Sequence, residues 1–69
     1  MEKRQMTLIL NDKEMTVLDD LAGRRGLTKT ALLKQALRLY QSVTDRIDGG
    51  EKVFFEHPAS KEKTELMVI

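Results

Sequence analysis

The chain has 69 residues, a net charge of +1 and no cysteine, with 41% hydrophobic and 33% charged residues. This is the balance of an ordinary soluble protein, and it excludes disulfide stabilisation and a zinc site built from thiolates and several imidazoles, because His57 is the single histidine. A chain this short buries little apolar surface alone, so we expect association to stabilise it.

Residues 1–10 have the alternating character of one short strand, and no second strand follows before the first helical pattern. A lone strand leaves its backbone N–H and C=O groups unpaired, and its own copy in a second chain is the simplest partner. The sequence therefore predicts a homodimer.

The first helix begins after Asn11, whose side chain can accept from the amide of Glu14 while the Glu14 carboxylate reaches back to the Asn11 amide. A glycine at Gly26, with Gly23 before it, suits the positive φ that closes many helices, so this helix is expected to end near Arg25. Apolar residues recur within it at spacings of three and four, at Met15, Leu18, Leu21 and Ala22.

Thr28 is the expected N-cap of a second helix, which Gly49 and Gly50 end. Its apolar residues cover more than half of the circumference: Ala31, Leu32, Leu33, Ala36, Leu37, Leu39, Tyr40, Val43 and Ile47. Two apolar faces are what a helix needs when it packs within its own chain and across a two-fold dimer.

The rest of the sequence predicts a hairpin of residues 52–56 and 64–69 around a loop with His57, Pro58 and Ser60. A single hairpin is marginally stable alone, so this one must pack against another surface or stay mobile. We therefore expect a domain over residues 1–48 and an extension over 49–69. Residues 1–47 hold nine basic and six acidic side chains, whereas residues 48–69 hold three and five. The two parts are expected to meet different partners.

Residues 4–47 resemble the ribbon-helix-helix family of MetJ/Arc-type DNA-binding proteins. The likeness rests on Arg4 to Leu10, Asn11 with Glu14, the pair Leu18 and Leu21, and Gly26 to Ala31. It implies a mainly α fold with one N-terminal strand, an intertwined homodimer, and an antiparallel ribbon that enters the major groove of double-stranded DNA.

The resemblance also implies that outward side chains of the ribbon read base edges. Strand alternation places Met6, Leu8 and Leu10 toward the helices; the outward base contacts are then Gln5, Thr7 and Ile9. Gln5 can pair with adenine, Thr7 can donate or accept, and Ile9 can touch a thymine methyl.

Ile9 departs from the polar residue common at this point in the family. Either it reads thymine, or protein covers the outward face and the ribbon has lost base readout. A register shifted by one residue would instead expose Met6, Leu8 and Leu10.

Phosphate contacts are expected at the start of the second helix, from Thr28, Lys29 and Thr30, because the first amides of a helix lack internal partners. Thr28 can also be a cap and nothing more. Further phosphate contacts are expected from Lys3, Arg4 and Arg25.

No residue pattern suits catalysis, and Asp19 and Asp20 diverge on adjacent helix positions, so we expect no enzyme, no cofactor and no metal site. The function expected is a cytoplasmic, sequence-specific repressor without a membrane segment, which binds an inverted repeat and can assemble further on DNA. Two alternatives stay open: an antitoxin whose residues 50–69 hold a toxin or other protein partner, and an assembly module that binds no DNA.

Overall fold

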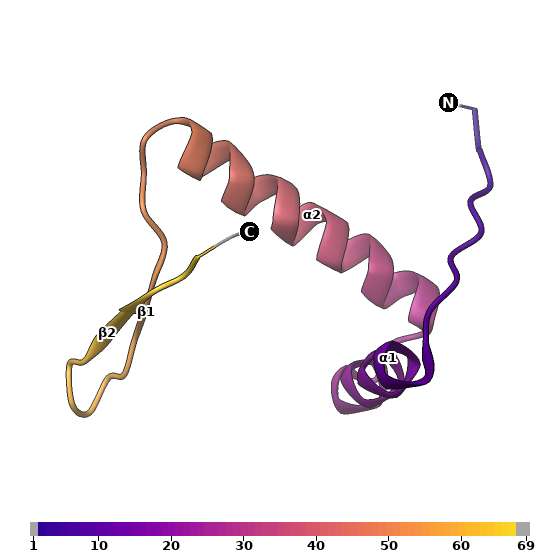
Figure 1. The fold of residues 1–69 in the computed structure, drawn as a ribbon, viewed down its shortest axis with the longest axis horizontal. Coiled ribbons are helices and arrows are strands. Elements are labelled where there is room, and N and C mark those ends of the chain that lie inside the picture. The colour runs from indigo at the N-terminus through magenta and orange to yellow at the C-terminus, as the bar shows by residue number, and fades with distance from the viewer. Residues whose placement is uncertain (1, 68–69) are drawn as a thin grey trace. The chain divides into compact units, whose positions relative to one another are not determined.

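The structure, a computed structural model, describes residues 2–67 and shows two helices and a short hairpin in that range (Figure 1). The elements in chain order are α1 (Asp12–Arg25), α2 (Lys29–Asp48), β1 (Phe54–Glu56) and β2 (Lys63–Glu65). The expectation of a mostly helical chain with a C-terminal hairpin is confirmed. The intertwined homodimer stays a prediction.

The chain divides into two compact parts, residues 1–33 and residues 34–69. The predicted domain boundary between residues 48 and 49 falls where α2 ends, and it stays a prediction.

Residues 2–10 form no strand within a single chain. None of their backbone groups has a hydrogen-bond partner among residues 2–67. A strand exists only where a second strand completes its ladder, so the predicted N-terminal strand depends on a second copy and stays a prediction. Met1, the first residue of that predicted strand, lies outside the described residues.

The predicted limits of α1 are confirmed by its capping contacts. Asn11 Oδ1 accepts from the Glu14 amide at 2.8 Å, and Glu14 Oε1 accepts from the Asn11 amide at 3.1 Å. At the other end Gly26 has φ +64°, and the amide of Leu27 donates to the Ala22 carbonyl at 2.9 Å. These bonds satisfy backbone groups that the helix itself leaves unpaired.

Local contacts also set the limits of α2. Thr28 is its N-cap, because Thr28 Oγ1 accepts from the Ala31 amide at 3.1 Å. After Asp48 the amide of Gly49 donates to the Asp45 carbonyl at 3.1 Å, and Gly50 turns the chain with φ +94°. Both predicted ends are confirmed.

The hairpin pairs β1 and β2 antiparallel, with Phe55 opposite Thr64. β1 starts two residues after the predicted 52 and ends at the predicted 56, whereas β2 starts one residue before the predicted 64 and ends at Glu65. Away from the loop, one further backbone hydrogen bond follows among the described residues, from the Leu66 amide to the Val53 carbonyl at 2.7 Å. Residues 68 and 69 of the predicted second strand lie outside the described residues.

The predicted loop between the strands is confirmed. Lys61 closes it, donating its amide to the His57 carbonyl at 2.8 Å with a positive φ of 62°. This hydrogen bond spans four residues, as in a single turn of helix that does not continue, and the turn joins the two strands.

Neither part of the chain has a core of its own. Ala22, 6% exposed, is the one buried apolar residue among residues 2–67. The half-buried apolar residues of the first part are Leu10, Leu18, Leu27, Ala31 and Leu32. Those of the second part are Val43, Ile47, Val53 and Leu66. The other large apolar residues of α2 are exposed: Leu33, Leu37, Leu39 and Tyr40.

Gly26→Ala and Gly23→Ala should change stability in opposite directions. A Cβ at either position meets nothing within 4 Å, so backbone conformation alone decides the effect. At Gly26, with φ +64°, alanine should cost about 1 to 2 kcal/mol of unfolding free energy. At Gly23, inside α1, it should add up to about 1 kcal/mol. Urea unfolding of both variants measures this, and equal effects would contradict the assigned end of α1.

Candidate nucleic-acid interface

Exposure alternates along the last residues before α1. Leu8 is 48% exposed and Leu10 is half-buried, whereas Ile9 between them is 90% exposed. Of these three side chains, Ile9 is the most accessible. Met6, expected on the same face as Leu8 and Leu10, is 86% exposed in the single chain.

The three predicted base-contact residues are accessible. Gln5 and Thr7 are exposed like Ile9, and they occupy the same alternate positions. Together they offer an amide, a hydroxyl and an apolar side chain, in that order along 2–10.

The start of α2 leaves two amides without an acceptor in the described chain. Thr28 Oγ1 takes the Ala31 amide and the Thr28 carbonyl takes the Leu32 amide, so the amides of Lys29 and Thr30 have no such partner. Thr28 therefore has the structural role of a cap. Two free amides at the positive end of a helix dipole suit an anion.

The Lys29 side chain is already engaged. Its Nζ lies 2.9 Å from Asp19 Oδ1 and 3.9 Å from Met15 Sδ, so it crosses the turn between the helices. Sequence analysis missed this ion pair, because the two residues meet only through the direction that the chain takes at Gly26. A phosphate at this helix end would share or displace the Asp19 carboxylate.

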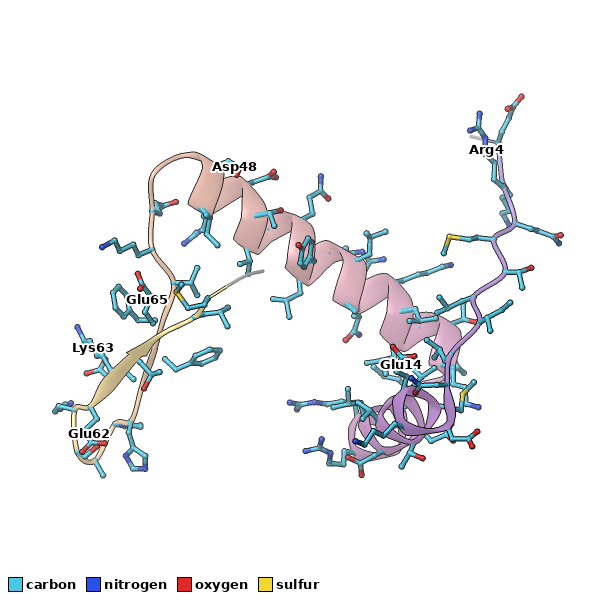
Figure 2. All side chains as sticks on the ribbon, in the orientation of Figure 1. Arg4, Glu14, Asp48, Glu62, Lys63 and Glu65 are labelled. Atoms are coloured by element: carbon cyan, nitrogen blue, oxygen red, sulfur yellow. The ribbon has the colours of Figure 1, made fainter. Side chains whose placement is uncertain are left out.

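The remaining predicted phosphate contacts, Lys3, Arg4 and Arg25, are exposed, and no ion pair involves them among residues 2–67. Arg4 is labelled in Figure 2. Arg24, next to Arg25, is paired with Asp20 at 3.0 Å, one helical turn earlier. The i, i+4 spacing would have found that pair from sequence.

All nine predicted contact residues belong to residues 1–33. They form two groups, one on residues 3–9 and one around the turn between α1 and α2. No hydrogen bond or ion pair joins the two groups within the described chain.

The described residues contain no group of three potential metal ligands, and neither helix has the length and apolar character needed to cross a membrane. His57 is exposed in the hairpin loop, where Nδ1 accepts from the Ala59 amide at 3.3 Å. Comparisons with models of protein families, with curated proteins and with solved structures found no match.

Proposed function

We propose that this chain is a sequence-specific repressor that binds double-stranded DNA as a homodimer. Two copies pair residues 2–10 into an antiparallel ribbon, which enters the major groove of an inverted-repeat operator. The observation that carries the proposal is the state of residues 2–10: their backbone groups have no hydrogen-bond partner within residues 2–67, and Gln5, Thr7 and Ile9 at alternate positions are exposed.

A second copy is supported by the distribution of apolar residues. Leu33, Leu37 and Tyr40 recur along one face of α2 and are all exposed in the single chain. Leaving such apolar side chains in water is unfavourable, and the burial of each contributes roughly 1.5 to 3 kcal/mol to the free energy of association. Two copies of α2 packed face to face would cover these residues.

Base readout is supported by the exposed side chains at alternate positions of residues 2–10, Gln5, Thr7 and Ile9. Gln5 and Thr7 can form hydrogen bonds with base edges in the major groove. Ile9 is not covered by its own chain. Of its two interpretations we adopt contact with a thymine methyl, because the neighbouring polar residues share its face.

Backbone binding is supported by the cationic and amide groups of the same part of the chain. The free amides of Lys29 and Thr30 can hold a phosphate, and Arg4 and Arg25 can neutralise others. These contacts supply affinity and set the position of the ribbon, whereas the ribbon side chains discriminate between sequences.

Leu37→Ala should destabilise the protein far more than its 70% exposure in one chain suggests. A leucine buried between two copies of α2 costs about 2 to 5 kcal/mol when truncated. Arg38→Ala, beside it on the same helix, should change the unfolding free energy by less than about 0.5 kcal/mol. Thermal unfolding at several protein concentrations measures both. Equal and small effects at every concentration would remove α2 from a dimer interface.

Thr7→Val, which keeps the shape of the side chain and removes the hydroxyl, should weaken operator binding by about 1 to 3 kcal/mol and leave binding to unrelated DNA unchanged. The operator is first obtained by selection from random duplexes. Thr16→Ala on α1 is the matched control, since its hydroxyl bonds only the Asp12 carbonyl of its own helix. Operator affinity that survives Thr7→Val would exclude this hydroxyl from readout.

Lys29→Ala should weaken binding to all DNA sequences alike and reduce the salt dependence by about one unit of slope. Asp19→Asn should do the reverse and strengthen binding to all sequences, because it releases Lys29 from the 2.9 Å ion pair. Lys52→Ala removes the same charge from the other part of the chain and should have no such effect. Titrations at several salt concentrations test the three variants, and a sequence-selective loss in Lys29→Ala would contradict the phosphate role.

A further inference from the structure

The outer edge of β2 has backbone groups free for pairing. Leu66 N–H bonds the Val53 carbonyl at 2.7 Å and His57 N–H bonds the Glu62 carbonyl at 2.8 Å, so alternate residues 62, 64 and 66 turn their backbone toward β1. The residues between them turn theirs the other way, as in any antiparallel ladder. Lys63 and Glu65 therefore present N–H and C=O groups on the outer edge.

The side chains at this edge carry opposite charges. Lys63 and Glu65 are exposed, lie on the same face of the hairpin by strand alternation, and make no ion pair within residues 2–67 (Figure 2). Thr64 between them lies on the opposite face. The edge is thus an alternation of one cation and one anion about a central threonine.

We propose that β2 pairs antiparallel with β2 of a second copy, about a two-fold axis at Thr64. In this register Lys63 of each copy lies directly opposite Glu65 of the other, and both residues turn their free backbone groups toward each other. Each of the two Lys63–Glu65 pairs between the copies would then combine an ion pair of the side chains with backbone hydrogen bonds. Shifting the axis to Lys63 or to Glu65 would place like charges opposite each other.

The outer edge of β1 is less suited to the same pairing. The position two residues after Glu56 on that edge is Pro58, which has no N–H to donate. Pairing through β2 would give a four-stranded sheet with β1 at its two outer edges. A two-stranded hairpin is marginal by itself, and a four-stranded sheet gives it the pairing it lacks.

This second self-association does not involve residues 2–10 and does not depend on DNA binding. Where the two interfaces join different pairs of copies, the assembly is larger than a dimer. The hairpin would then link one pair of chains to the next, and its partner is a second copy of this chain.

The test uses the full chain, which has no cysteine of its own. With Thr64→Cys the two thiols lie at the two-fold axis, in a pair whose Cα atoms are close enough for a disulfide. Mild oxidation should yield covalent dimers at least about tenfold faster than with Glu62→Cys, because paired strands hold the thiols at millimolar effective concentration. The control thiol at position 62 lies two residues away from the two-fold axis in each copy, so the two control thiols are not opposite each other. Equal rates for the two variants would overturn the proposal.

Charge reversal provides a second test in the Thr64→Cys background. Glu65→Lys should lose the rapid cross-linking, because two lysines then oppose each other. Lys63→Glu should lose it as well. An equal mixture of the two variants should recover rapid cross-linking as mixed dimers, since every opposed pair is again of opposite charge, and this recovery would show that both hairpins remain folded. Rapid cross-linking by Glu65→Lys alone, or none in the mixture, would overturn the proposed register.

Discussion

The need to bury apolar side chains is the constraint on which the rest of this structure depends. A single chain covers Ala22 and leaves Leu37 and Ile9 in water. A chain of 69 residues without cysteine has no disulfide to compensate for so small a core. A second copy is the source of burial that needs no other molecule, and it is therefore the starting point for both proposed interfaces.

The two interfaces use the same physical rule at opposite ends of the chain. Residues 2–10 and β2 each present backbone groups without a partner inside the described chain. Such an edge accepts another strand, and the side chains beside it decide which strand and in which register. In the proposed ribbon the outward side chains would be a glutamine, a threonine and an isoleucine, which suit base edges. At β2 they are opposite charges, which suit a copy of the same strand.

The ion pair between Lys29 and Asp19 connects the shape of the turn with the proposed phosphate site. The carboxylate holds the side chain of Lys29, the first residue of α2, across the turn between the helices. An arriving phosphate would exchange one anion for another at the same place. If the chain binds DNA as proposed, the lysine is already held at the turn between the helices, with part of its charge neutralised by Asp19.

The sequence by itself determined the limits of both helices and the place of the hairpin loop. The capping box of Asn11 and Glu14, the glycine at Gly26 and the Thr28 cap are contacts within a few residues, so residue type and spacing predict them. Only the tertiary structure decided that Lys29 meets Asp19 and that, among residues 2–67, Ala22 is the one buried apolar residue. Both depend on the path of the chain after Gly26, because residues distant in sequence make contact only where the backbone brings them together.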